Sequence, residues 1–212
     1  MTYNIISTGS KGNAVVLNDN ILIDCGVSMK QLRPYIQSLR LVLLTHKHSD
    51  HFKARVVAAL RKERPTLRWG CCEWMVPLLL ESGVHPGTID VYDVGGEYAY
   101  GTIAVKPVSL VHNVPNCGYH IFSGGEKILY ATDTGSLDGV EANDYDLYMI
   151  EANHAEEELR QREAAKLARG EFSYEAAAAM NHLSREKALA WLSKNAGAKS
   201  RVVFLHQHED RN

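Results

Sequence analysis

The sequence lacks any apolar run long enough to cross a bilayer, since its longest apolar stretches reach only about ten residues. It also lacks the basic segment and apolar segment of a signal peptide near Met1. Its four cysteines show no CxxC spacing, so we interpret them as small core residues in a reducing compartment. These absences predict a cytoplasmic protein that makes no contact with membranes.

The sequence also has no large excess of positive or negative charge. Lys and Arg total 23 and Asp and Glu total 25, which gives a formal net charge of −2 at pH 7. This balance excludes a strongly basic nucleic-acid coat protein, although it allows a local basic patch. Repeats, low-complexity tracts and Pro/Gly/Ser-rich linkers are absent as well, so we expect a single domain over residues 1–212.

Short apolar runs alternate with helical patterns along the chain. We expect strands over residues 4–7, 14–17, 21–24, 41–45, 67–71, 103–108, 118–122, 127–132, 147–151 and 202–205. We expect helices over residues 29–39, 52–62, 73–81, 156–169 and 184–195. Because proline fits best in a first helical turn, Pro34 is an alternative start for the first of these helices. Because the strands fall into two groups flanked by helices, this order predicts an α/β fold of two face-to-face sheets with helices outside.

The sequence is rich in histidine, with ten in all, and three of them lie in one short segment. The strand over residues 41–45 runs directly into His46, His48, Asp50 and His51. On an extended segment His46 and His48 point the same way, because side chains alternate with period two. Asp50 and His51 lie at the following turn and can face a second point. The spacing therefore predicts two adjacent metal ions rather than a solvated polar turn.

Each predicted metal site needs further ligands, because zinc sites in hydrolases keep about three protein ligands and one open position. Three residues of the right type stand at the ends of other expected strands: His112, Asp133 and His206. His208 competes with His206 for the last place, and we favour His206 because it directly follows its strand.

The segment HKHSDH resembles the HxHxDH motif of the metallo-β-lactamase superfamily. Asp24 in ILIDCG is similar to the first acidic motif of that family, and the later ligand motifs follow in the family's order. The resemblance implies a four-layer αββα sandwich of two mixed sheets with helices outside. It also implies a pair of divalent metal ions, zinc or alternatively manganese.

The resemblance further implies which side chains hold the two ions: His46, His48, Asp50, His51, His112, Asp133 and His206. His46, His48 and His112 would hold one ion. Asp50, His51 and His206 would hold the other, and Asp133 would bridge both. Asp24 would bind neither ion but would orient one of the ligands or the HxHxDH loop.

Two further motifs resemble the nuclease branches of the superfamily, namely Glu151 in EANH and His182 in NHLS. In ribonuclease Z-like proteins such a pair is thought to protonate the leaving oxygen, and a departing alkoxide does need a proton. The candidate catalytic residues are therefore Asp50, Glu151 and His182. With STGSKGNA and TDTG, these motifs resemble the YycJ (WalJ) group of small single-domain nucleases.

The interval between Asp133 and His206 is filled by two expected helices and two expected strands, which leaves no room for a β-CASP insert. The resemblance thus implies a dimetal phosphodiester hydrolase, a nuclease that attacks phosphorus with a metal-activated hydroxide and acts on DNA or RNA. The alternatives are a phosphodiesterase for a cyclic nucleotide or cyclic phosphate, a lactonase or thioesterase on the same metals, and an inactive metal-binding scaffold.

The expected partners are nucleic acid or a small phosphodiester, with the chain itself a monomer or a homodimer. Three residues beside the motifs stay open as substrate contacts: Lys11, His154 and His208.

Overall fold

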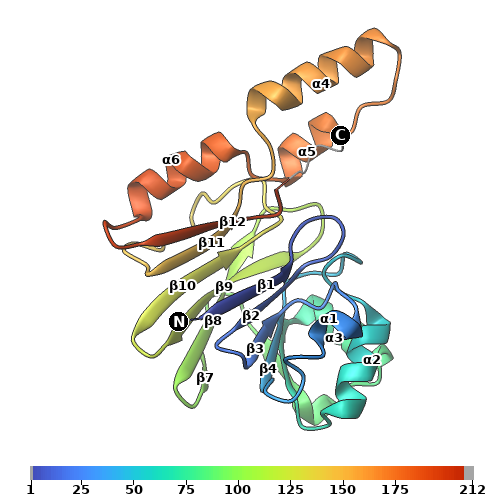
Figure 1. Cartoon of the computed structure of the whole chain (residues 1–212), viewed down its shortest axis with the longest axis vertical. Coiled ribbons are helices and arrows are strands. Elements are labelled where there is room, and N and C mark those ends of the chain that lie inside the picture. Colours follow the sequence, from blue (N-terminus) through green and yellow to red (C-terminus); the bar gives the residue numbers. More distant parts are fainter. Residues whose placement is uncertain (1, 208–212) are drawn as a thin grey trace. The chain divides into compact units, whose positions relative to one another are not determined.

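The structure is a computed structural model that describes residues 2–207. The chain divides after Tyr100 into two compact units. Within the described residues the strands form two mixed sheets of six strands each (Figure 1). The single domain over residues 1–212 stays a prediction. None of the helices in the described part of the chain is both long and apolar enough to cross a membrane.

The first sheet follows the chain order, and its strands are β1 (Tyr3–Ser7), β2 (Ala14–Leu17), β3 (Ile21–Ile23), β4 (Leu41–Leu44), β5 (Arg68–Cys72) and β6 (Ile89–Tyr92). The pairs β1–β2 and β2–β3 are antiparallel, and β3 to β6 run parallel. Every residue of β2, β3 and β4 is buried, as the unbroken apolar sequence of β4 predicts. The parallel pairing puts the ends of β3 and β4, and the polar residues after them, at one edge of this sheet.

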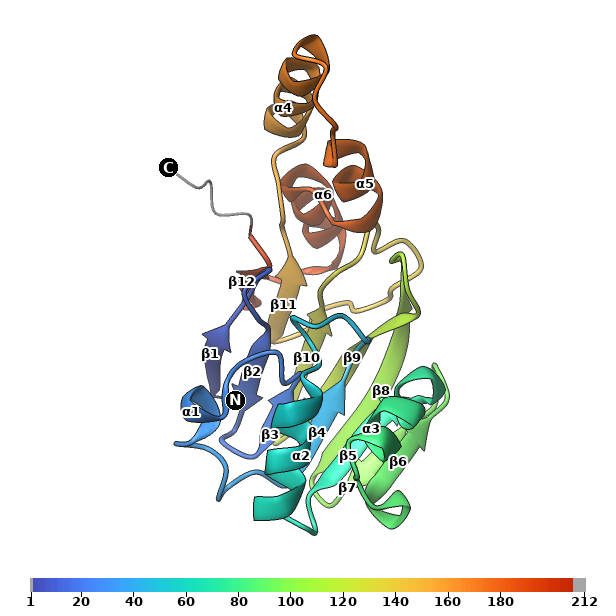
Figure 2. The same ribbon diagram turned by 90° about the vertical axis from the view of Figure 1, so that its right-hand side faces the viewer.

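Three helices belong to this unit, namely α1 (Met29–Leu32), α2 (Ala54–Glu63) and α3 (Val76–Glu81), with short 3₁₀ turns at Glu73–Met75 and Pro86–Thr88. The three helices lie on one face of the sheet (Figure 2). Their apolar side chains pack there, for example Leu60 and Leu79 in one cluster with Val42 and Trp69. This packing fixes the start of α2, so that the loop between β4 and α2 is held at both ends.

The expected helix over residues 29–39 is wrong in its length, and the alternative start at Pro34 is wrong as well. Helix α1 begins after Ser28, whose side chain accepts from the backbone N–H of Gln31 in a capping box, and it ends at Leu32. Pro34 follows that end. It has no N–H to continue the i→i−4 hydrogen-bond pattern, so the chain continues in turns.

The second sheet has the order β12-β11-β10-β9-β8-β7. Its strands are β7 (Tyr98–Tyr100), β8 (Ile103–Leu110), β9 (Asn116–Ser123), β10 (Glu126–Ala131), β11 (Leu147–Glu151) and β12 (Arg201–Leu205). The pairs β8–β9 and β9–β10 are antiparallel, whereas β10–β11 and β11–β12 are parallel. The carboxyl ends of β10, β11 and β12 therefore meet at one edge of this sheet.

Helix α6 (Arg185–Asn195) packs Ala188 and Leu192 into one core cluster with Tyr148 and Ile150 of β11. Helices α4 (Glu156–Ala168) and α5 (Glu175–Asn181) lie beyond the ends of the strands (Figures 1 and 2). An ion pair of 2.6 Å between Lys166 and Glu175 joins these two helices.

Three elements were not expected from the sequence, namely β6, β7 and α5. The two strands have only four and three residues, and the apolar positions of α5 are mostly alanines, so none of the three carries a clear hydrophobic period. The interpretation of the cysteines is confirmed in its structural part, because Cys25, Cys71, Cys72 and Cys117 are all buried and none of them forms a disulfide bond.

Candidate metal and catalytic site

The loop after β4 gathers one cluster of imidazoles in the first unit. The ring centroids of His46 lie 4.7 Å from His48 and 4.1 Å from His51. His46 and His51 are fully buried, whereas His48 and Asp50 are half-buried. Since β4 ends at Leu44, the switch from strand to loop is what turns these polar groups toward one another.

Asp24 fixes the orientation of this cluster from behind. Its fully buried carboxylate accepts from the Thr45 backbone N–H at 3.0 Å and lies 2.7 Å from His51 Nδ1. A proton on His51 Nδ1 therefore has Asp24 as its acceptor, so that a cation would have to be coordinated through Nε2.

The hydroxyl of Thr45 joins Asp24 to a second imidazole. Thr45 Oγ1 lies 2.9 Å from Asp24 Oδ2 and 3.0 Å from His46 Nδ1. When the hydroxyl donates to the carboxylate, it accepts from His46 Nδ1–H, so that a cation would have to be coordinated through His46 Nε2 as well. Both buried histidines of the loop thus present the same type of nitrogen.

The spacing of the nitrogen atoms fits a metal ion. His46 Nε2 and His48 Nδ1 are 3.1 Å apart. Two imidazole ligands on a tetrahedral zinc ion, each about 2.0–2.1 Å from it, have their nitrogen atoms about 3.3 Å apart. The donor types and their spacing therefore suit a divalent cation of the zinc class.

The turn after β1 supports the same loop. The backbone N–H of Asn13 donates to the carbonyl oxygen of Asp50 at 2.6 Å, and its side-chain nitrogen lies 2.7 Å from His51 Nε2. A Cβ atom at Gly26 would lie 1.6 Å from the Asp50 carbonyl oxygen, so this close approach requires glycine. The Gly-rich motif at the start of the chain therefore packs against the HKHSDH loop.

A second cluster lies at the ends of the parallel strands of the second unit. Asp133 follows β10, Glu151 ends β11, and His206 follows β12. Potential ligand atoms of these three residues and of His182 all lie within 4.8 Å of one another. His182 follows α5 and is about one-fifth exposed at its side chain, whereas Glu151 is fully buried.

The carboxylate of Glu151 contacts four hydrogen-bonding groups. Oε1 lies 2.7 Å from His182 Nδ1 and 3.0 Å from His206 Nδ1. Oε2 accepts from the backbone N–H groups of Thr134 at 2.9 Å and Leu183 at 3.2 Å. Because an ionised carboxylate offers about four lone-pair positions, these contacts saturate it. Glu151 thus holds the rings of His182 and His206 beside it.

The ionisation of Glu151 follows from the same contacts. Burial alone would raise its pKa, but the hydrogen bonds to His182 and His206 outweigh burial and lower the pKa below its usual value. The carboxylate is therefore ionised at neutral pH. Its Oε1 is therefore the acceptor for a proton on His182 Nδ1.

Three strand-end residues of the two clusters adopt left-handed backbone conformations. Asp24, Asp133 and His206 have φ angles of 58°, 57° and 50°. Residues other than glycine seldom occupy this region, and such conformations gather at functional sites, where the surrounding contacts hold them. At Asp133 these contacts include Asn116, whose side chain donates to the carbonyl oxygens of Thr132 and Asp133 at 3.1 Å and 2.7 Å.

His112 lies beside the second cluster. Its Nδ1 is 3.0 Å from the carbonyl oxygen of Asn181, and its ring centroid is 5.4 Å from that of His182. A proton on Nδ1 therefore has a backbone acceptor, and Nε2 faces away from it. In this respect His112 has the same arrangement as His51 in the first unit.

Sequence reasoning missed the groups that hold the ligands. Thr45 and Asn116 were not among the candidates, nor was Asn153, whose side chain donates to the carbonyl oxygen of His206 at 2.8 Å. Thr45 could have been found from its place between a buried strand and the first motif histidine. Asn116 carries no such signal, because it precedes Thr132 by sixteen residues.

The structure gives a different result for each of the three residues that the sequence left open as substrate contacts. His154 is buried, and its carbonyl oxygen accepts from the backbone N–H of Arg185 at 2.8 Å, which favours a structural role. Lys11 is exposed. His208 lies outside the described residues.

Comparison with known proteins gives the family. Residues 19–207 match the family model described as the beta-lactamase superfamily domain. The chain belongs to the metallo-β-lactamase superfamily. The expected fold is confirmed by solved structures, since the chain is similar over 99% of its length to a metallo-β-lactamase fold protein, YhfI from Bacillus subtilis, with a TM-score of 0.72, 17% identity and 87% of that chain covered. The resemblance to ribonuclease Z is confirmed as a similarity of fold to the short form of human tRNase Z, with a TM-score of 0.71, 16% identity, and 99% and 93% of the two chains covered.

Sequence relatives of this metallo-β-lactamase superfamily member include nucleases. The chain is 26% identical to exodeoxyribonuclease WalJ of Streptococcus pneumoniae over 99% of its own length and 82% of that protein. It is 25% identical to exodeoxyribonuclease YycJ of Bacillus anthracis over 74% of its own length and 65% of that protein. The predicted resemblance to this group is confirmed as a distant homology. The fold and the His and Asp clusters together indicate a metal-dependent hydrolase.

Proposed function

We propose that this protein is a dimetal-dependent phosphodiester hydrolase that acts as a nuclease on DNA. The observation that carries the proposal is the 2.7 Å contact between Glu151 and a partly exposed His182, which lies beside Asp133 and His206. The exodeoxyribonuclease names of the distant relatives support the choice of DNA.

The metal ligands that we propose are the seven side chains of the sequence motifs: His46, His48, Asp50, His51, His112, Asp133 and His206. Support comes from within each unit, where Thr45 and Asp24 bond the Nδ1 sides of His46 and His51 and where Asp133 lies close to His206. Two divalent cations of the zinc class, held by these residues, would lower the pKa of bound water and take up charge on phosphate oxygens.

The chain's own residues supply the proton. With Nδ1–H of His182 bonded to Glu151, protonated His182 can donate from Nε2 to the oxygen that leaves phosphorus. Glu151 keeps the ring oriented, and the backbone N–H groups of Thr134 and Leu183 keep Glu151 in place. An alkyl alkoxide needs this proton because it is a poor leaving group. An acyl substrate on a dimetal site needs it less, so the pair favours phosphodiester chemistry over lactone or thioester hydrolysis.

One assay panel tests the proposal. The purified chain, supplied with Zn²⁺ or Mn²⁺, is incubated with end-labelled single- and double-stranded DNA and RNA, bis-p-nitrophenyl phosphate, cyclic nucleotides, a lactone and a thioester. We expect cleavage of DNA and of bis-p-nitrophenyl phosphate. Cleavage restricted to cyclic nucleotides would favour the small-molecule phosphodiesterase. Hydrolysis of only the lactone or thioester would overturn the proposal.

The variant His182→Ala tests the proton donor. We expect the rate with DNA, whose leaving group is an alkoxide, to fall about 10²- to 10⁴-fold, because a positioned general acid contributes that much. The rate with bis-p-nitrophenyl phosphate should fall far less, because p-nitrophenolate leaves without a proton. Metal content, measured on the same sample, should stay at the wild-type value. Equal losses on the two substrates would refute the role of His182.

A further inference from the structure

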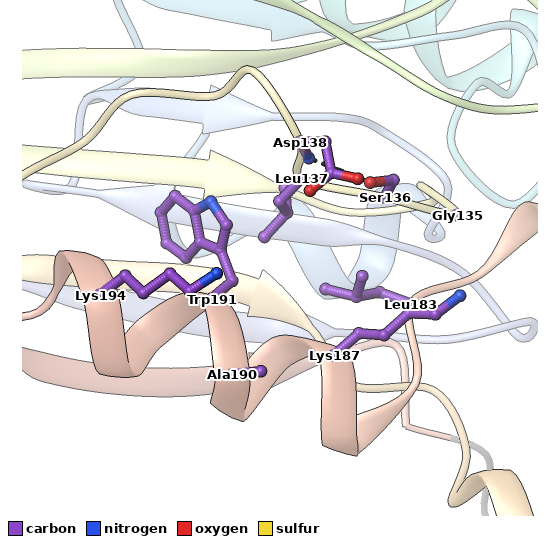
Figure 3. Close-up of a pocket in the computed structure, with 9 residues that line it drawn as sticks. All are labelled: Gly135, Ser136, Leu137, Asp138, Leu183, Lys187, Ala190, Trp191 and Lys194. Atoms are coloured by element: carbon purple, nitrogen blue, oxygen red, sulfur yellow. Dashed lines mark hydrogen bonds between the residues drawn. The ribbon is translucent and has the colours of Figure 1, made fainter.

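A cavity of about 350 Å³ lies in the second unit, between α6 and the loop that follows Asp133 (Figure 3). Its lining includes Ser136, Asp138, Leu183, Lys187, Trp191 and Lys194. The volume is in the range of small-molecule sites, which are commonly 300–1,000 Å³. Neither the proposed metal ligands nor the proposed proton donor is among the residues that line it.

Helix α6 presents an aromatic ring and two cations on one face. Lys187, Trp191 and Lys194 are spaced at i, i+4 and i+7, which places them on the same side of a helix. Figure 3 shows all three on the side of α6 that faces Leu137 and Asp138. Within the described residues, neither lysine ammonium group forms an ion pair and the indole N–H of Trp191 has no hydrogen-bond acceptor. These groups are therefore available to a ligand.

The cavity shares its walls with the second cluster. The two backbone N–H groups that donate to Glu151 Oε2 belong to Thr134 and Leu183, which lie next to or within the lining. Gly135 also lines the cavity, and a Cβ atom there would lie 2.0 Å from the carbonyl oxygen of Met180. The loop after Asp133 is thus packed against the end of α5, one residue before the chain reaches His182.

We propose that this cavity binds one nucleotide of single-stranded DNA next to the scissile phosphate. The base stacks on Trp191, and the adjoining phosphates pair with Lys187 and Lys194. This inference rests on the proposed nuclease function. Stacking on an aromatic ring combined with cationic side chains is how proteins bind single strands without reading the sequence. The buried Leu137 and Leu183 give the base an apolar floor, while exposed Asp138 repels phosphate and directs the backbone toward the lysines.

The variant Trp191→Ala tests the stacking. Loss of one base–aromatic stack is expected to weaken binding of a single-stranded pentanucleotide about 5- to 100-fold. The ratio of kcat/KM for the oligonucleotide to kcat/KM for bis-p-nitrophenyl phosphate should fall by a similar factor, because the small substrate has no base. Trp191→Phe keeps an aromatic face and should recover most of the ratio. A loss that Phe does not recover, or a ratio that stays at the wild-type value, would overturn the proposal.

The double variant Lys187→Ala/Lys194→Ala tests the phosphate contacts. Each phosphate contact to a single strand contributes about 0.7 to the slope of log K against log salt concentration, so we expect the slope to fall by about 1.4. Lys199→Ala is the matched control, because Lys199 is exposed and does not line the cavity. An unchanged slope in the double variant, or an equal change in the control, would contradict the proposal.

Binding measured by fluorescence anisotropy separates this inference from the proposed function. Wild-type binding that Trp191→Ala weakens, in a protein that cleaves no DNA, would support the cavity and reject the nuclease. Cleavage by the wild type that neither variant alters would support the nuclease and reject the cavity. A wild-type chain that neither binds nor cleaves oligonucleotides would reject both.

Discussion

Single hydrogen bonds decide which nitrogen atom each histidine of the first cluster presents. Asp24 takes the Nδ1 side of His51, and the Thr45 hydroxyl takes the Nδ1 side of His46. Each ring therefore has one orientation and one tautomer. Because Asp24 and Thr45 are buried, water cannot replace the contacts between them when one partner is lost. A change at Thr45 should thus alter the orientation of the proposed metal ligands His46 and His51, although Thr45 is not itself a proposed ligand.

The substitution Thr45→Val tests this arrangement. It removes the hydroxyl between Asp24 and His46 and keeps nearly the same volume. We expect Zn²⁺ affinity to fall about 10- to 100-fold, the usual cost of losing a group that orients a metal ligand. The free energy of unfolding should fall by about 1–3 kcal/mol, because a buried carboxylate loses a donor.

A competition titration with a chromophoric chelator measures the affinity. Thr45→Ser is the matched control, since it keeps the hydroxyl. Wild-type affinity in Thr45→Val would show that the hydroxyl does not orient the ligands.

At the scale of elements, the helices of the second unit differ in the contacts that hold them in place. Helix α6 is fixed by Ser184 at its start, whose hydroxyl accepts from the backbone N–H of Lys187 at 3.1 Å, and by apolar contacts with β11. Helix α4 buries only Leu159 and carries three acidic residues in its first turn. Its association with α5 therefore depends strongly on the contact between Lys166 and Glu175, and α5 in turn positions His182.

The pH dependence of this helix pair follows from Glu175. Hydrogen bonds from Lys166 and Ser173 lower the pKa of Glu175 to about 2. Since the folded-state pKa lies below the unfolded value of about 4.5, the contact stabilises the helix pair above pH 4.5 and is lost as the pH falls toward 2. Amide hydrogens of α5 should thus exchange more slowly in the wild type than in Glu175→Gln at pH 6. This difference should shrink as the pH falls below 4.5 and should vanish below pH 2. A difference that persists at low pH would contradict the assignment.

At the scale of the whole molecule, the two sheets use the same order of pairing. In each sheet antiparallel strands come first and parallel strands follow. The carboxyl ends of the parallel strands are where Asp24, His46, Asp133, Glu151 and His206 stand. Because parallel strands end at a common edge, the topology of each sheet brings the polar residues of that sheet together without any need for them to be close in sequence.

His120 on β9 gives a pH effect on global stability. Its ring packs against Tyr145 with centroids 5.6 Å apart, and it pairs in register with Lys106 of β8. Burial, with a smaller effect from Lys106, lowers the pKa of His120 from 6.5 to about 4. In the unfolded chain His120 takes up a proton near pH 6.5, whereas the folded chain does so near pH 4. The contribution of neutral His120 to the free energy of unfolding is therefore fully present above pH 6.5 and is lost as the pH falls from 6.5 to 4.

Urea unfolding between pH 7 and pH 4 measures this loss. The contribution of His120 should reach at most about 3 kcal/mol at the acid end, since each pKa unit corresponds to about 1.4 kcal/mol. In the variant His120→Gln, the free energy of unfolding should lack this part of its decrease with falling pH. His85→Gln should keep it, because His85 is exposed. Equal slopes for wild type and His120→Gln would show that His120 titrates normally.

The sequence by itself determined the types and order of the chemical groups. The period-two spacing of His46 and His48, the apolar run of β4 and the strand-end positions of Asp133 and His206 are local features. Local sequence fixes them through side-chain alternation and burial. The likeness of the motifs to the metallo-β-lactamase superfamily added the fold and the pairing of Glu151 with His182.

Only the tertiary structure decided which groups support these side chains. Asn116 reaches the Asp133 backbone, Asn153 reaches His206, and the cavity beside Trp191 forms where α6 meets a loop some fifty residues earlier in the chain. Such contacts depend on strand register and helix packing, which are set by the core as a whole. β6, β7 and α5 were not predicted because they are short and carry no clear hydrophobic period, so their place depends on the elements beside them in the fold.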